Sequence, residues 1–367
     1  MHLNTAIATL FVSFNVLSLA SPTEYYPSGG SGCPPISGDF NVSNFRLYPE
    51  GFDYDSVHCK AYFGSLYNGT VLKKDLTTGE EEILTFPGIS GNDTYHLSTV
   101  QYNRKTGVMY LSANNGIAFV SNGVNLTGPN TFIKYDTSID RVVFTADMGS
   151  ILAELKARTG SIYNGYQDIA EDVAGNAYYM TTFGPSITKI TPEGTLSLFF
   201  YLPPVIINGT TQANWAGIFS VGNVLVSLDN VSGKMFRLDT TAKDPFKDYS
   251  IYPLADSPPR SDVKIICDRI YPPPMFGGKI ALCSNDGTGT YVFYSNDVWK
   301  SAKYLGLVAS PNDGGVPTAA CQITNSLYTN SEYFLDGGPT FDQVGSRTVF
   351  PFTDITQEVL KLTRSVG

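Results

Sequence analysis

The sequence predicts an all-β protein folded as a six-bladed β-propeller, and two observations lead to this fold class. First, short runs of β-branched and aromatic residues alternate with Gly, Asn and Asp turns along most of the chain, as in KAYFGSLYNGTVLKKDL and KIALCSNDGTGTYVFYS. Second, similar hairpin units recur at spacings close to the length of one four-stranded blade, with a single longer interval. The units begin at YPEGFDYD, YHLSTVQYN, GYQDIAED, ANWAGIFS, RSDVKIICD and VPTAACQI.

The start of the chain differs from the repeats in composition. Residues 6–20 are apolar and end on SLA, a small-residue pattern typical of a signal peptidase site, so residues 1–20 are predicted to be a signal peptide. The run is shorter than the ~20 residues that a membrane-spanning helix needs, and no later segment is long and apolar enough to span. Residues 21–39 are rich in Gly and Pro and are predicted to form an extended arm, followed by the propeller over residues 40–367.

Six Asn-x-Ser/Thr sequons are consistent with passage through the secretory pathway. Each would place a glycan on a surface loop. We therefore expect a glycoprotein that is secreted or held in the lumen of a vesicle. The sequons begin at Asn41, Asn68, Asn92, Asn125, Asn208 and Asn230.

The five cysteines suit an oxidising compartment, in which disulfides form. Their connectivity cannot be read from sequence alone. Cys267 and Cys283 bracket the Gly-Gly turn of a predicted hairpin, and Cys33 with Cys59 could tie the arm to the first blade. Cys321 is then the odd cysteine. Its apolar neighbours predict a buried strand, in which a small Cys has a structural role.

The longest interval between repeats contains ADMGSILAELKARTGS, whose apolar spacing predicts one short helical insertion between blades. This helix either covers the edge of a blade or forms a lid. The strand that closes the ring is expected from TVFPFTDI or from FRLY near the start of the chain. One blade would then contain strands from both ends of the chain, which removes an open sheet edge.

The charge balance excludes two classes of partner. The formal net charge is −9, only 16% of the residues are charged, and no basic run is present. Nucleic acids and anionic membrane surfaces are bound by clustered Lys and Arg, so neither is a predicted partner. The chain also lacks a Gly-x-Ser-x-Gly elbow, a Walker loop, a dinucleotide fingerprint and a His or Cys metal motif. We expect a monomer.

The opening residues of the repeats are the candidate site. In a propeller the innermost strand of each blade begins at the same end of the central channel, so these residues converge on one pocket. Most of them are hydrogen-bonding groups that would be costly in an apolar core. They could instead satisfy backbone groups at the starts of strands. The matching residues are Glu50, His96, Gln167, Asn214, Asp262 and Thr318.

The openings PEGFDYD, QDIAEDVAGNAYYMTT, NWAGIFS and SDVKIICD resemble those of the regucalcin, gluconolactonase and strictosidine-synthase-like propellers. The resemblance implies a site for a divalent cation, with Glu50, Asn214 and Asp262 at three of its four ligand positions and Gln167 in place of an Asn. Such an all-oxygen set suits Ca²⁺ or Mg²⁺. The longer Gln side chain can displace a ligand atom, so we expect no cofactor and keep Ca²⁺ or Mg²⁺ as the alternative.

Over its whole length the chain resembles the fungal trichothecene biosynthesis cluster protein 14 family, on the stretches CPPISGDF, YQDIAEDVAGNAYYMTTFG and NWAGIFSVGNVLVSLDN. The resemblance implies a role in the biosynthesis of trichothecenes, which are sesquiterpenoid mycotoxins, with a small, apolar, oxygenated sesquiterpenoid as partner. The implied reaction is that of a dehydrative cyclase: an oxygenated sesquiterpene triol loses water as one hydroxyl closes a pyran ring.

This reaction needs an acid for the departing hydroxyl, a base for the attacking one and an apolar pocket for the ring system. The hypothesis makes Glu50 or Asp262 the acid, and His96 or the partner carboxylate the base. Paired carboxyls in one channel push their pKa values apart, so that one stays protonated. Gln167, Asn214 and Thr318 would hold hydroxyl groups, and Tyr95, Tyr166 and Trp215 would form apolar walls.

Two other functions use the same scaffold, because a fold does not determine an activity. A metal-dependent lactonase or esterase would lose activity when a chelator removes its cation. A non-catalytic secreted binding or virulence protein would show no change in any reaction rate when the site carboxyls are replaced. A cyclase would tolerate a chelator and respond to Glu50→Gln or Asp262→Asn.

Overall fold

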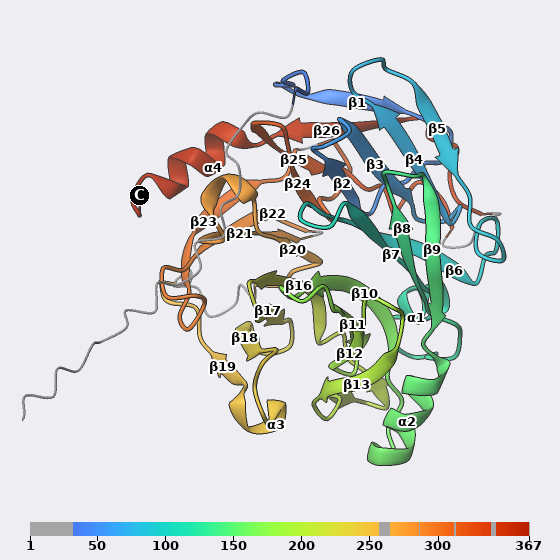
Figure 1. Ribbon diagram of the computed structural model, residues 1–367, viewed down its shortest axis with the longest axis vertical. Helices are drawn as coiled ribbons and strands as arrows, with labels where there is room; N and C mark the ends of the chain where they lie inside the picture. Colours follow the sequence, from blue (N-terminus) through green and yellow to red (C-terminus); the bar gives the residue numbers. More distant parts are fainter. Residues whose placement is uncertain (1–31, 257–264, 286, 312, 339–342, 367) are drawn as a thin grey trace, which may run out of the picture.

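Six antiparallel four-stranded sheets surround a central axis in the computed structural model, which describes residues 32–366 except 257–264, 286, 312 and 339–342 (Figure 1). The first blade contains β2 (Phe52–Asp55), β3 (Lys60–Ser65), β4 (Thr70–Asp75) and β5 (Glu81–Leu84). The second blade contains β6 (Tyr95–Asn103), β7 (Val108–Asn115), β8 (Thr131–Asp136) and β9 (Arg141–Asp147). The third blade contains β10 (Asn164–Glu171), β11 (Ala177–Phe183), β12 (Ser186–Ile190) and β13 (Leu196–Tyr201). The next two are β16 (Trp215–Val221), β17 (Val224–Asp229), β18 (Lys234–Asp239) and β19 (Ser250–Tyr252), and β20 (Arg269–Tyr271), β21 (Ile280–Asn285), β22 (Gly289–Tyr294) and β23 (Lys303–Ala309). The sixth is β24 (Ala320–Ile323), β25 (Ser326–Asn330), β26 (Val349–Asp354) and β1 (Phe40–Ser43). The predicted six-bladed propeller is confirmed.

The innermost strands form a closed ring around the channel. In order they are β2, β6, β10, β16, β20 and β24, and each packs against the next until β24 returns to β2. All six begin at the same end of the channel, which we call the entry face. Because neighbouring strands in a blade are antiparallel, the loops after each second and fourth strand also reach the entry face.

The ring is closed by strands from both ends of the chain, as predicted. β1 pairs with β26, and Phe40 lies opposite Phe352 with the two rings stacked 5.0 Å apart. The closing segment is FNVS and not FRLY. In the latter, Arg46 and Tyr48 have φ values of 58° and 41°, which an extended strand does not accommodate.

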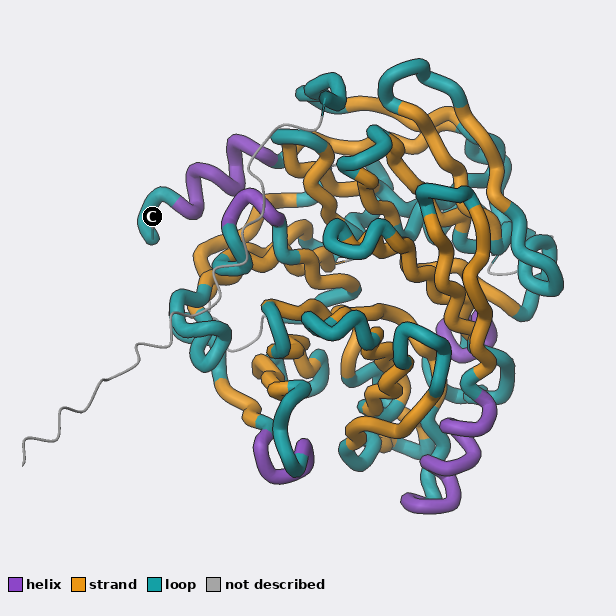
Figure 2. The backbone as a smooth tube through the Cα atoms, in the orientation of Figure 1, coloured by secondary structure: helices purple, strands orange, loops and turns teal. Residues whose placement is uncertain are grey.

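The predicted helical insertion is α2 (Gly149–Thr159), and it covers the edge of a blade. Its buried Ile151 and Leu155 contact Leu196 and Leu198 on β13, the outer strand of the third blade. The structure adds α1 (Gly116–Val120), α3 (Pro245–Asp248) and α4 (Thr356–Thr363), which are too short to stand out from the strand pattern. Figure 2 shows α2, α3 and α4 at the outside of the ring.

Aromatic and aliphatic side chains fill the spaces between and within the blades.

Both disulfide pairs suggested by the sequence are confirmed, Cys33 with Cys59 and Cys267 with Cys283. The first ties the end of the N-terminal arm to the turn between β2 and β3. Cys321 is unpaired and buried.

Some expectations concern residues that the structure does not describe. The predicted signal peptide, the arm up to residue 31 and the candidate Asp262 lie outside the described residues. From residue 32 onward the arm is followed directly by β1. Within the described ranges, no helix has the length and apolarity needed to cross a membrane.

Candidate functional site

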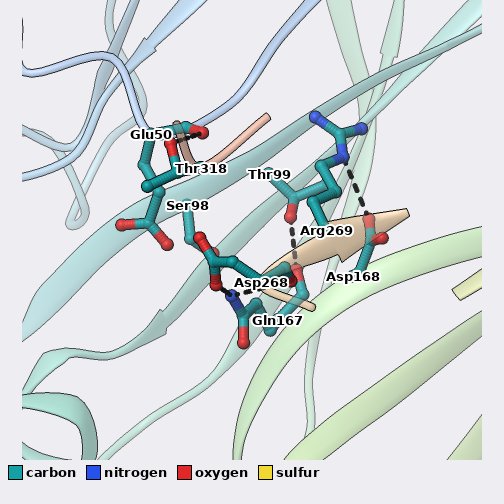
Figure 3. A pocket seen from close by; sticks show the side chains of 8 residues that line it. All are labelled: Glu50, Ser98, Thr99, Gln167, Asp168, Asp268, Arg269 and Thr318. Atoms are coloured by element: carbon teal, nitrogen blue, oxygen red, sulfur yellow. Dashed lines mark hydrogen bonds and ion pairs between the residues drawn. The ribbon is translucent and has the colours of Figure 1, made fainter. Parts of the chain in front are cut away.

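A small polar pocket lies at the entry face of the channel, with about 170 Å³ of empty space that is partly open to solvent. Five of the six blades contribute to it, through residues at or just before the start of β2, β20 and β24 and through the middle of β6 and β10, whereas β16 does not. The convergence of strand openings is therefore real, although not every blade takes part. The lining residues are Glu50, Ser98, Thr99, Gln167, Asp168, Asp268, Arg269 and Thr318 (Figure 3).

Three of the predicted residues, Glu50, Gln167 and Thr318, meet in this pocket. The fifth blade contributes Asp268, the residue directly before β20, in the place for which the repeat alignment chose Asp262. The alignment placed the opening of this blade too early. A signal for the correct position was present, because the Asp in CDRIY immediately precedes an apolar strand.

Hydrogen bonds hold the centre of the pocket in one arrangement. The Gln167 side-chain amide donates from Nε2 to Oδ1 of Asp268 at 2.6 Å, and its Oε1 accepts from the Thr182 hydroxyl at 2.7 Å. The Thr99 hydroxyl donates to the backbone carbonyl of Gln167 at 2.5 Å. An amide donor stabilises a carboxylate, so Asp268 presents a fixed acceptor to the pocket.

A buried ion pair forms the wall between the third and fifth blades. Arg269 Nε lies 3.5 Å from Asp168 Oδ1, and Arg269 also donates to the carbonyl of Val100 at 2.8 Å. The Asp168 carboxylate accepts from the backbone N–H groups of Ile169 and Ile218, which ties β10 to β16. Burial raises the pKa of Asp168 to about 6, against the lowering effect of Arg269 and the two amides. The Asp168–Arg269 ion pair therefore holds the third and fifth blades together beside the pocket.

Thr318 forms a hydrogen bond with the backbone of Glu50. Its hydroxyl donates to the Glu50 carbonyl at 2.8 Å and accepts from Asn330 Nδ2 at 2.6 Å. Asn330 Nδ2 also contacts the carbonyl of Pro49. The Thr318 hydroxyl is therefore engaged in positioning Glu50, which differs from its expected role of binding a substrate hydroxyl.

A second acid, Glu332, lies near the entry face and was missed by the sequence analysis. It is fully buried, and neither side-chain oxygen has a hydrogen-bond partner within the described structure. Its backbone pairs with Val316 through two bonds of 2.8 Å, and it projects to the same side as Asn330, two residues earlier. Burial raises the pKa of Glu332 well above its usual value, and Asp336 and Asp268 add to the effect.

His96 lies against Tyr67 and not in the pocket wall. Its ring is 5.2 Å from that of Tyr67 in an edge-to-face arrangement, and it packs against Gly116, where an added Cβ would lie 2.7 Å from the imidazole. Burial raises the pKa of Tyr67, and the negative charges of Glu332 and Glu50 raise it further. His96 is absent from the residues that line the pocket.

The three aromatic residues expected as pocket walls do not line the pocket. Trp215 is 1% exposed and its ring lies 4.6 Å from that of Phe236 in a blade core. Tyr166 is fully buried and bonds to Thr188 at 2.5 Å. Tyr95 bonds to the Thr131 hydroxyl at 3.2 Å. Side chains alternate along a strand, so the neighbours of a channel-facing residue point into the blade.

The observed arrangement differs at Gln167 from the divalent-cation site that the regucalcin resemblance implies, and Asp262 of that set lies outside the described residues. Gln167 turns its nitrogen to Asp268, and its oxygen is taken by Thr182. Asn214 is buried and directs its amide to Asp229 at 3.5 Å, although its Oδ1 has no partner. Among the described side chains, no group of three or more His, Cys, Asp or Glu residues is arranged to hold a metal ion.

Comparisons with known proteins agree with this architecture. Residues 28–244 match the family described as Mal s 1 allergenic protein-like. The chain is 26% identical over 353 residues to trichothecene biosynthesis protein 14 of Trichoderma arundinaceum, covering 90% of this chain and 92% of the relative. It is also 26% identical over 370 residues to core trichothecene cluster protein 14 of Fusarium sporotrichioides, covering 92% and 90%. The predicted resemblance to these proteins is confirmed.

Solved structures show the same fold. The Mala s 1 allergen of Malassezia sympodialis superposes with a TM-score of 0.73 at 19% identity, over 87% of this chain and 96% of the allergen. A calcium-binding regucalcin of Agrobacterium tumefaciens superposes with a TM-score of 0.51 at 16% identity, over 87% and 95%. At these identities the likeness concerns the fold alone.

Proposed function

Because this chain belongs to the Mal s 1 allergenic protein-like family and aligns over most of its length with two trichothecene cluster proteins, we propose that it acts in trichothecene biosynthesis. Its proposed reaction is the dehydrative closure of the pyran ring of an oxygenated sesquiterpene triol. The observation that carries the proposal is the presence of three carboxyl groups, Glu50, Asp168 and Asp268, in one small polar pocket. Asp168 is paired with Arg269, so we assign the chemistry to the other two.

The two carboxyl groups divide the chemistry between them. Asp268, stabilised by the Gln167 amide, takes the proton of the attacking hydroxyl, and Glu50 gives a proton to the departing allylic hydroxyl. One C–O bond forms, another breaks and one water leaves, so no oxidant or reductant is needed.

The size of the pocket determines how such a substrate must bind. The lining side chains leave no space for a water-sized group inside the pocket, whereas sites for drug-sized ligands begin at ~300 Å³. The polar edge of the triol, with its reacting hydroxyls, therefore enters only the mouth of the pocket, and the hydrocarbon rings remain outside it. Ser98 and Thr99 supply further hydroxyl groups along the wall.

The proposal includes passage through the secretory pathway. The two disulfides support an oxidising compartment. Five of the six sequon asparagines are exposed or half-buried, as glycan acceptors must be. Asn230 is the exception, because it is buried and both of its amide atoms bond to the backbone of Cys267 at 2.8 and 2.9 Å. We propose glycans on the other five only.

The test is the rate and stereochemistry of ring closure of the triol by the purified glycosylated protein. Loss of either group should slow the reaction by about 100-fold or more, the usual contribution of acid–base catalysis. The variants are Glu50→Gln and Asp268→Asn, with exposed Glu358→Gln on α4 as the control.

Acceleration that survives a chelator, falls in both pocket variants and persists in the control supports a cyclase that needs no divalent cation. A rate equal to that in buffer would overturn the cyclase proposal. Unchanged rates in both pocket variants would place the chemistry elsewhere on the protein.

A further inference from the structure

Five exposed aliphatic side chains gather on two segments of the entry face. α1 and the loop after it carry three of them, and β14 (Ile206–Ile207), which forms a hairpin with β15 (Thr210–Thr211), carries the other two. Single exposed aliphatic residues are common, but a group of them marks a binding surface. The exposed fractions are 40% for Ile117, 38% for Val120, 73% for Val124, 55% for Ile206 and 51% for Ile207. We call these five residues the apolar rim.

The two segments of the apolar rim are in contact. The Phe119 ring of α1 lies 5.3 Å from that of Phe183, which is bridged to Ala213 just after the hairpin. Gly123 has a φ of 79°, and a Cβ at this position would lie 2.9 Å from the Phe183 ring. Only a glycine allows the loop to approach so closely. Gly123 also adjoins Thr211, the strand partner of Ile206, so the loop after α1 packs against the hairpin.

The apolar rim adjoins the polar pocket through shared residues. A Cβ at Gly165 would lie 3.2 Å from the Phe119 ring, and Gln167 of the pocket follows two residues later on β10. On β11, Thr182 donates to the Gln167 side chain at 2.7 Å, and the next residue is Phe183. The pocket and the rim therefore rest on the same two strands of the third blade.

We propose that the apolar rim binds the hydrocarbon rings of the terpenoid whose hydroxyl groups enter the pocket. This inference rests on the proposed function and deepens it by placing the part of the substrate that the pocket cannot enclose. A ligand with one polar edge and an apolar body matches a polar floor beside an apolar wall.

The glycosylation signals on the rim favour a small molecule over a protein as the occupant. Asn125 lies in the loop after α1 and Asn208 in the hairpin, next to Val124 and Ile207, and both are exposed. Glycans at these positions would obstruct a protein partner or a second copy of this chain, because they are bulky and hydrated. A terpenoid is small enough to lie between them.

The test removes apolar surface from the hairpin without touching the pocket. The double variant Ile206→Ser/Ile207→Ser should raise KM for the triol by at least about 10-fold and change kcat by less than about 2-fold, because apolar contacts away from the reacting groups contribute binding. The matched control is Ile139→Ser, which is 57% exposed in the turn between β8 and β9 at the opposite end of its blade.

A second measurement separates this inference from the cyclase proposal. Farnesol, an uncharged fifteen-carbon alcohol, serves as the probe in saturation-transfer NMR with the intact glycosylated protein. Weaker transfer in the double variant and unchanged transfer in the control support the rim even if no form of the protein closes the ring. Equal farnesol binding by the wild type and the double variant overturns the inference. So does a wild-type dimer in light scattering that the double variant dissociates, since the rim is then a subunit interface.

Discussion

Replacing Glu332 by Gln should remove a pH dependence from the stability of this protein. The side chain is fully buried and its carboxyl oxygens have no hydrogen-bond partner among the described residues. Burial is the main cause that raises its pKa, and the charge of Arg347 only partly opposes it. The folded protein therefore holds this proton more tightly than the unfolded chain, in which the pKa of a Glu is about 4.3.

The sign of the effect follows from proton counting. Below the unfolded pKa both states are protonated at this site, and it contributes no slope. Between the unfolded and the folded pKa the folded state binds more protons, so the free energy of unfolding falls as pH rises. One group contributes at most about 1.4 kcal/mol for each pH unit. A Gln at position 332 has no proton to lose, so this part of the slope disappears.

The measurement is urea unfolding of the wild type and Glu332→Gln at pH 5, 6 and 7. The difference between the two free energies should change steadily with pH in favour of the variant, whatever the fixed cost of burying an amide. Glu358→Gln, the same change at an exposed position of α4, should leave the slope as it is. Parallel curves for the wild type and Glu332→Gln would refute the reasoning, since the buried carboxyl would then hold its proton no more tightly than the unfolded chain does.

Two further substitutions test assignments at other positions. Trp215→Ala should lower the free energy of unfolding by about 3–5 kcal/mol in urea titrations, because the ring is buried between Phe200 and Phe236, and a small change would place it outside the core. Asn230→Ala should cost about 1–3 kcal/mol by leaving the Cys267 backbone unpaired, yet leave the glycan mass unchanged in mass spectrometry. Asn125→Gln, at an exposed sequon, should instead remove the mass of one glycan.

The architecture was predictable because its signals are local and repeated. Alternating aromatic and β-branched residues between Gly and Asn turns predict hairpins, and their recurrence predicts blades. The two suggested cysteine pairs, which are 26 and 16 residues apart, are both formed. The alignment of strand openings brought Glu50, Gln167 and Thr318 together, because the topology of a propeller makes these positions converge.

The remaining parts of the site depend on features that the repeats do not encode. Asp268 was missed because the connection between β19 and β20 is irregular in length, so the start of the strand could not be aligned. Asn214 precedes its strand as expected, but it turns toward Asp229 within its own blade. Glu332 lies in the loop after β25, which is the second strand of the sixth blade. Only the folded ring brings it near Glu50 and Tyr67.

The entry face thus combines two kinds of structure with different tolerance to change. The polar pocket is built from strand openings that also hold the blades together, since Thr99 binds the Gln167 backbone and Asp168 binds the Ile218 backbone. A substitution there alters both chemistry and packing. The apolar rim is built from the short helix α1, the loop after it and a hairpin, all outside the blades, so its exposed side chains can change without loss of the fold. Residues of the rim are therefore the positions at which variants should separate the binding of a substrate from its conversion.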